Sequence, residues 1–265
     1  MTEIKKGLIK DLPNDAYHAD LTHLSSSTLK LLLTDLNKFY EERILKLPRD
    51  NKSSDVFDFG SLLHCMVLEP ELLEKDFITY SGWVRRGAEY QQFKEDNPGK
   101  IIIAKPQMKK AEALFETYQK NETAVNLIKG IEPEISLFSS IDDVPIKVRA
   151  DGLNRERRYI VDLKTTGFGL DCDSFKVTME RFHYHLSASL YLKAFEQELG
   201  VPLTFYFIVL GKSDVGCKVY KFSDKSRQLG NSQLVKAIEI YKQCISTGDW
   251  TGQTKIDVEG DIEEV

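Results

Sequence analysis

The stretch Pro145–Thr166, with the sequence PIKVRADGLNRERRYIVDLKTT, decides the fold that we expect for this chain. It contains two short runs of apolar and β-branched residues, Ile146–Ala150 and Tyr159–Lys164, which predict two strands. The run Gly152–Arg158 between them is rich in glycine, asparagine and charged residues, which are typical of a turn. The stretch is therefore expected to form an antiparallel β-hairpin.

Three side chains with useful chemistry fall at the end of this predicted hairpin. Asp151 directly follows the first strand, while Asp162 and Lys164 lie two residues apart in the second and so share a face. Two carboxylates suit Mg²⁺ or Mn²⁺, and a nearby lysine can orient water or neutralise developing negative charge. The pattern D-x-K is short and common, so a solvated hairpin with an incidental Asp–Lys pair is the alternative.

The composition is that of an ordinary globular protein. Of 265 residues, 42% are hydrophobic and 29% charged, with a net charge of −5. An acidic chain argues against DNA binding through bulk charge, but it allows an enzyme with a local basic groove. The four widely spaced cysteines show no zinc pattern and predict free thiols. With no apolar run of about 18 residues and no signal peptide, we expect a soluble, cytoplasmic protein.

Helical and strand patterns alternate along the chain in a definite order. Ser25 or Ser26 can cap a helix over residues 28–45, and a second helix begins near Phe59 and ends at Pro70. Further helices are expected at 107–120, 123–128, 173–199 and 226–247, and further strands at 101–104, 131–140, 204–210 and 217–222. This order predicts an α/β fold with a mixed central sheet flanked by helices. A single domain is expected over residues 1–250, with a helical N-terminal part and a flexible acidic tail at 251–265.

Residues 71–105 are predicted to be mostly a long connector. Within it, Arg85 and Arg86 lie between Trp83 and Tyr90. Arginines beside aromatic residues suit contact with a phosphate backbone and base stacking. A solvated loop with a packed tryptophan explains the same residues equally well.

Several short motifs occur in one order along residues 17–195. They are LSSSTLK, FGSLLHCMVLEPE, RRGAEYQQF, EISLF, RADGL, VDLKTT and YHLSASLY. Taken in this order they resemble the nuclease domain of the RecE-type exonucleases (exonuclease VIII), a branch of the PD-(D/E)xK nuclease superfamily. The resemblance implies a restriction-endonuclease-like PD-(D/E)xK core, and it rests on the ordered set because no single motif is specific.

The resemblance also implies roles for individual residues. Asp151 and Asp162 match the metal-binding aspartates of the family, and Lys164 matches its catalytic lysine. His64, which alone would suggest a core or surface residue of an apolar helix, matches the histidine of the metal site. Glu134 is a weaker match to a metal ligand.

A later helix both matches and departs from the family pattern. Tyr191 matches a tyrosine of the site, with a catalytic role implied. Ser187 stands where the family has a glutamine, and a serine is too short to reach as far. A water molecule or His185 could take the place of that glutamine near the DNA.

The function implied by the resemblance is that of a Mg²⁺-dependent 5′→3′ exonuclease on double-stranded DNA, with Mn²⁺ tolerated. Such an enzyme resects DNA ends for a single-strand annealing partner in recombination, and the family implies a homo-oligomeric ring and a phage or prophage origin. A single-strand or flap nuclease of the same fold is one alternative. A non-catalytic module that binds DNA ends is an alternative of another class.

Overall fold

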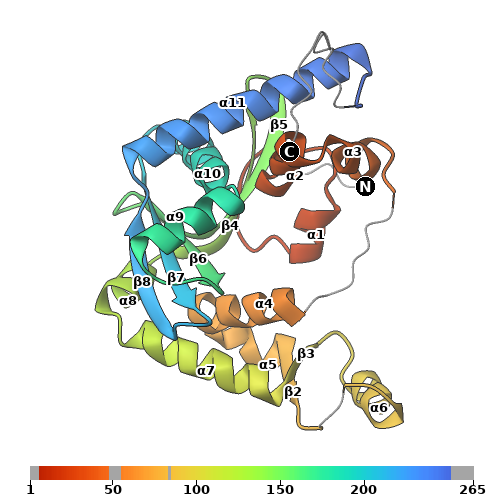
Figure 1. The fold of residues 1–265 in the computed structure, drawn as a ribbon, viewed down its shortest axis with the longest axis vertical. Helices are drawn as coiled ribbons and strands as arrows, with labels where there is room; N and C mark the ends of the chain where they lie inside the picture. Colours follow the sequence, from red (N-terminus) through yellow and green to blue (C-terminus); the bar gives the residue numbers. More distant parts are fainter. Residues whose placement is uncertain (1–5, 48–54, 83–84, 252–265) are drawn as a thin grey trace, which may run out of the picture.

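The fold is built on a six-stranded mixed sheet, shown in Figure 1. The computed structural model describes residues 6–47, 55–82 and 85–251. The strand order is β1-β4-β5-β6-β7-β8, with β6 and β7 parallel and every other neighbouring pair antiparallel. The strands are β1 (Gly7–Ile9), β4 (Glu132–Ile141), β5 (Val144–Asn154), β6 (Tyr159–Thr166), β7 (Thr204–Gly211) and β8 (Gly216–Lys221). The predicted mixed central sheet is confirmed.

Helices pack on both faces of the sheet, and each face has its own apolar core (Figure 1). The helices of the first face are α2 (Ser26–Thr34), α9 (Cys172–Arg181), α10 (Tyr184–Leu199) and α11 (Asp224–Thr247). Those of the second face are α4 (Asp55–Leu68), α7 (Lys105–Gln119) and α8 (Glu122–Ile128). The flanking helices expected from the sequence are therefore present.

Strand β6 divides its side chains between the two cores. Ile160 belongs to the core of the first face, whereas Val161 and Leu163 belong to that of the second. Because side chains alternate along a strand, Asp162 and Lys164 lie on the first face, the one that α10 covers.

The predicted hairpin is present, but its first strand is longer than expected. Asp151 lies inside β5 rather than at its end, and the turn is confined to Arg155–Arg158. Gly152 pairs with Val161 in the ladder. A Cβ at Gly152 would lie 2.5 Å from Ile131 Cδ1 and 2.7 Å from Val161 Cγ2. Glycine is needed there for close packing and not for a turn.

Two of the predicted helices are broken by local backbone chemistry. The helix expected at 28–45 is divided at Asp35 into α2, α3 (Leu36–Phe39) and a π-helical turn, Tyr40–Ile44. The Asp35 side chain accepts a hydrogen bond from Lys38 N at 2.9 Å, so it starts a new helix instead of continuing the old one. The helix expected at 173–199 is divided where His183 adopts a left-handed conformation, φ 50°.

The connector expected at 71–105 contains more structure than its sequence indicates. A short parallel pair, β2 with β3, lies there beside several short helices. These elements are a 3₁₀ turn (Pro70–Leu72), α5 (Leu73–Asp76), β2 (Phe77–Tyr80), α6 (Ala88–Asp96) and β3 (Ile101–Ala104). Only the strand at 101–104 was expected, because α5 and β2 are four residues long and carry too little periodicity to detect, and the nine-residue α6 has no buried face.

The N-terminal region adds α1 (Asn14–Ala19) before α2. No helix among the described residues is long and apolar enough to span a membrane. The acidic tail predicted at 251–265 lies outside the described residues beyond Thr251, so its flexibility stays a prediction.

Candidate active site

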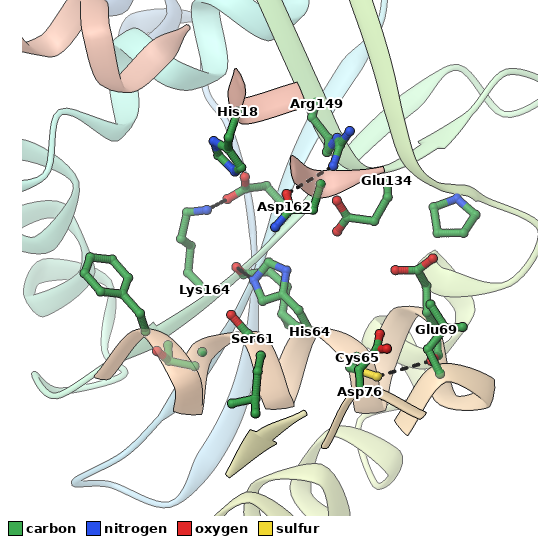
Figure 2. A pocket seen from close by; sticks show the side chains of 18 of the residues that line it. His18, Ser61, His64, Cys65, Glu69, Asp76, Glu134, Arg149, Asp162 and Lys164 are labelled. Carbon is green, nitrogen blue, oxygen red and sulfur yellow. Dashed lines mark hydrogen bonds and ion pairs between the residues drawn. The ribbon is translucent and has the colours of Figure 1, made fainter. Parts of the chain in front are cut away.

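A large cavity opens between the N-terminal helices and α4, over the middle strands of the sheet (Figure 2). Its volume is about 1740 Å³. The sequence-predicted site residues that line it are His64, Glu134, Asp162, Lys164, Ser187 and Tyr191. Asp151 adjoins them through His64, whose Nδ1 lies 3.6 Å from Asp151 Oδ2. The fold therefore gathers residues that are far apart in the sequence.

Leu163 positions two of the predicted metal ligands through its main chain. Its N–H donates to Asp151 Oδ2 at 2.6 Å, and its carbonyl oxygen lies 2.9 Å from His64 Nε2. A carbonyl oxygen can only accept, so Nε2 carries the hydrogen and a neutral His64 keeps a lone pair on Nδ1. The β5–β6 ladder ends at the pair Gly152–Val161. The Leu163 main chain is thereby left available to these two side chains.

Asp162 and Lys164 form a buried ion pair on one face of β6, as strand alternation predicts. Lys164 Nζ lies 2.5 Å from Asp162 Oδ2, and Asp162 is 5% exposed. The Lys164 ammonium group is the partner of that carboxylate oxygen. Burial raises the pKa of Asp162, and the neighbouring Asp151 raises it further, against the opposing effect of Lys164.

The charge state of Lys164 follows from its neighbours. Burial lowers the pKa of its ammonium group, but the carboxylates of Asp162 and Asp151 outweigh burial, so that the pKa is raised overall. Lys164 is therefore a fixed cation at neutral pH, suited to stabilise negative charge and unsuited to accept a proton.

Glu134 combines an unusual backbone with a crowded carboxylate. Its φ is 48°, in the left-handed region, although it lies within β4. In the register of β4 and β5 it would face Asp151, and no pair is formed between the flanking pairs Pro133–Gly152 and Ile135–Ala150. Burial, followed by repulsion from Asp151, raises the pKa of Glu134 to about 8. Left-handed residues other than glycine are strained, and such strain concentrates at functional sites.

The donor set at this point fits a divalent cation. A nitrogen of His64 and carboxylate oxygens of Glu134 and Asp151 lie within 4.8 Å of one another. The Nδ1 lone pair of His64 and the Asp151 oxygen face each other with no hydrogen between them when His64 is neutral. A bound cation would relieve that repulsion and the one that raises the pKa of Glu134. Mixed nitrogen and oxygen donors suit Mn²⁺ as well as Mg²⁺.

The side chains that lie close enough together to bind one cation differ in one respect from the metal ligands expected from the sequence. The structure groups His64 and Asp151 with Glu134, the residue expected to be the weakest match. Asp162 lies outside that group and is held by Lys164. Figure 2 shows Glu134 and Glu69 projecting into the same space from different elements. Repulsion from Glu69 contributes to the raised pKa of Glu134.

The helper residues of α10 reach the cavity only in part. Tyr191 and Ser187 both line it, and burial raises the pKa of Tyr191 well above its usual range. Ser187 Oγ lies 3.5 Å from the carbonyl oxygen of His183, one turn earlier in its own helix. His185 is buried with its ring tilted against Phe222, and it is not among the described residues that line the cavity. His185 therefore does not face the cavity, and what takes the place of the family glutamine stays a prediction.

The two arginines of the predicted DNA clamp lie elsewhere. Arg85 donates to the carbonyl oxygen of Ile102 in β3 at 3.4 Å, and Arg86 is exposed. Neither is among the described residues that line the cavity, and Trp83 lies outside the described residues. Their contact with DNA stays a prediction.

Two residues of the cavity were not singled out from the sequence. Lys30 of α2 and Tyr184 of α10 both line it, and the Tyr184 ring centroid lies 5.3 Å from the Nζ atoms of both Lys30 and Lys164. Burial, and then the charge of Lys164, lowers the pKa of Lys30 to about 8. Lys30 ends the LSSSTLK motif, but only the packing of α2 against the first face of the sheet brings it here.

Together, the sheet and the arrangement of Asp151, Asp162 and Lys164 on neighbouring strands define the PD-(D/E)xK class of fold. Residues 25–258 match the family described as "PDDEXK-like domain of unknown function (DUF3799)". The chain belongs to this family.

Two solved structures were compared with this chain, and one of them shares its fold. A protein described as "Putative exonuclease" from Eubacterium rectale is similar over 88% of this chain and 86% of its own, with 17% identity and a TM-score of 0.63. A "phage related exonuclease" from Haemophilus somnus aligns over 86% of this chain and 96% of its own, with 10% identity and a TM-score of 0.35, which does not indicate a shared fold. No curated protein matches the sequence.

Proposed function

We propose that this protein is a metal-dependent nuclease that hydrolyses DNA phosphodiesters. The observation that carries the proposal is the joint placement of Asp162, Lys164 and the group His64, Glu134 and Asp151 at one cavity. A surface hairpin with an incidental ion pair would not also gather a histidine from α4 and a strained glutamate from β4. PD-(D/E)xK nucleases generally use divalent metal ions, and the donor set present here fits one.

Each group of the chain has a distinct part in the proposed reaction. His64, Glu134 and Asp151 would hold the cation, with Asp162 beside them; when bound, such an ion activates water and stabilises charge on a phosphoryl oxygen. Lys164 stays protonated and points its ammonium group at the side of Asp162, where it can donate to an attacking water or a phosphate oxygen. Leu163 fixes the orientation of His64 and Asp151 from its main chain, so the cation ligands are preorganised.

The finer proposal is a Mg²⁺-dependent exonuclease that degrades duplex ends 5′→3′ and leaves single strands for an annealing partner. It is supported by the ordered motifs that resemble RecE-type enzymes and by the fold shared with the protein described as "Putative exonuclease". A homo-oligomeric ring would concentrate a few basic residues from each acidic subunit around DNA. Light scattering should then give a multiple of the 30.3 kDa chain mass, and a monomer at working concentrations would contradict the ring.

Substitution of Asp162 tests the catalytic assignment. Asp162→Asn keeps the shape of a buried side chain and removes its charge, so cleavage of linear duplex DNA with Mg²⁺ should fall by at least about 10²-fold. The matched control is Asp173→Asn, because the Asp173 side chain is 88% exposed on α9, and it should cleave normally. Circular dichroism checks that both variants fold. Full activity of Asp162→Asn would overturn the nuclease site.

Substrate form separates the alternatives. An end-dependent exonuclease degrades linear duplex DNA and spares a closed circle, whereas a flap or single-strand nuclease prefers branched or unpaired substrates. A non-catalytic module that binds DNA ends would cleave neither and would need no cation. Calorimetry with Mn²⁺ decides that last case, since heat of binding that disappears in Glu134→Gln supports the cation site.

A further inference from the structure

The rim of the cavity carries two exposed phenylalanines with an arginine on their rings. Phe168 is 41% exposed and Phe182 is 44% exposed, and both line the cavity. The Arg181 guanidinium lies 5.4 Å from the Phe168 ring centroid and 5.8 Å from that of Phe182. No carboxylate within the described part of the chain forms an ion pair with Arg181. Large apolar rings left open beside a cation without an ionic partner indicate a binding surface.

This rim is continuous with the reactive centre. The Phe182 ring stacks on Tyr184, with centroids 5.7 Å apart and planes 26° apart. The Tyr184 ring lies 5.3 Å from the ammonium groups of Lys30 and Lys164. A continuous series of aromatic rings and cations thus leads from the solvent to the ion pair with Asp162.

The fold places these side chains together for identifiable reasons. Phe168 follows the end of β6, and Lys212 follows the end of the parallel strand β7, so both lie at one edge of the sheet. Ligands commonly bind beyond the carboxyl ends of parallel strands. The left-handed His183 separates α9 from α10, with Phe182 and Tyr184 on either side of the break. Phe182 is not among the residues that form or pack against the core of the first face, whereas Tyr184 packs against that core and stacks on Phe207.

We propose that Phe168, Arg181 and Phe182 form a stacking surface for unpaired nucleotides of the strand whose phosphodiester reaches Lys164. The inference rests on the proposed nuclease function and adds to it where a single strand lies. Aromatic rings bind any base by its flat face, and cations between them contact the phosphates. Bases inside a duplex have both faces occupied by neighbours, so the surface selects unpaired nucleotides. Phosphate recognition at Lys30 and Lys212 would continue the path inward.

Binding without divalent cations tests this surface separately from cleavage. Fluorescence anisotropy in EDTA should show single-stranded oligodeoxynucleotides bound about 5- to 150-fold more weakly by Phe182→Ala or Phe168→Ala. Blunt duplex should be affected less than about threefold. Phe182→Tyr keeps a stacking ring and should restore the affinity. The control is Val177→Ala, because Val177 is 57% exposed on α9 and is not among the described residues that line the cavity.

Photocrosslinking gives a second readout that a merely structural role would not change. Single strands containing 5-iododeoxyuridine crosslink to aromatic residues on which the base stacks, and peptide mapping should place the crosslink on Phe168 or Phe182. Unchanged affinity in both alanine variants, equal losses for duplex and single strand, or crosslinks mapped elsewhere would each overturn the inference. If Asp162→Asn meanwhile abolishes cleavage, the nuclease function stands although the stacking surface does not.

Discussion

At the scale of single residues, Glu134 shows how the site departs from the most stable arrangement. It holds a left-handed φ of 48° and a carboxyl group whose pKa burial and Asp151 raise to about 8. Both features oppose folding of the protein without a cation. Both are consistent with a cation-binding carboxylate that the surrounding structure holds in a conformation and charge state that Glu134 would not adopt by itself.

Because of Glu134, the stability of the folded protein is expected to fall as the pH rises. Its pKa is about 8 in the folded protein and near 4.5 in the unfolded chain. The protonated carboxyl contributes fully below pH 4.5, and this contribution is lost as the pH rises towards 8. Without divalent cations, the Tm should fall from pH 5 to pH 8, and Glu134→Gln should flatten the profile and raise the Tm at pH 8 by at least about 3 °C.

The control for this prediction is its neighbour Glu132. Its carboxylate lies 2.5 Å from Lys10 Nζ and 2.6 Å from Arg155 Nε, so the same substitution there removes ion pairs. Glu132→Gln should not raise the Tm at pH 8. Mn²⁺ should stabilise the wild-type protein more than Glu134→Gln, because a ligand that binds only the folded state stabilises it. Equal stabilisation of the two would remove Glu134 from the cation site.

At the scale of elements, the separation of β5 from β6 beyond Gly152 creates the site. Gly152→Ala would place a methyl group 2.5 Å from Ile131 Cδ1 and 2.7 Å from Val161 Cγ2. Urea denaturation should show a loss of about 1–3 kcal/mol, as for other overpacked positions. The control is Gly167→Ala, where a Cβ would meet nothing within 4 Å, and it should be nearly neutral. Equal stabilities of the two variants would contradict the close packing.

The sequence predicted the bounds of an element best where its apolar pattern was clear. The bounds predicted for the strands at 204–210 and 217–222 and for the closing helix agree with the structure to within two residues. The prediction that Asp162 and Lys164 share one face of their strand is also confirmed. The position of Asp151 inside β5 was not predicted, because a glycine in the sequence can indicate either a turn or a close contact within a strand. Gly152 was predicted to be part of a turn, but it lies in the strand. The left-handed Glu134 and the approach of Lys30 could not be predicted, since both depend on tertiary packing.

At the scale of the whole molecule, the proposed DNA binding by a chain of net charge −5 would rely on a local concentration of cations. The cations of the single-strand path proposed above are Lys30, Lys164, Lys212 and Arg181. If about four phosphates are neutralised, log K for single strands should fall with log salt with a slope near −3. Titrations between 50 and 200 mM salt measure it. A slope steeper than about −6 would mean that a much larger basic surface is used, such as one formed by several subunits.

The main-chain contacts of Leu163 determine which substitutions its position can tolerate during evolution. The chemistry of the site uses only the N–H and carbonyl of this residue, while the core of the second face uses only its side chain. Valine or isoleucine at this position would provide the same main-chain groups and an apolar side chain for the core. The residue type at position 163 can therefore differ among relatives without any change in the proposed reaction. Proline is the exception, because it has no N–H to offer Asp151. An alignment would thus undervalue a residue on which two of the proposed cation ligands depend.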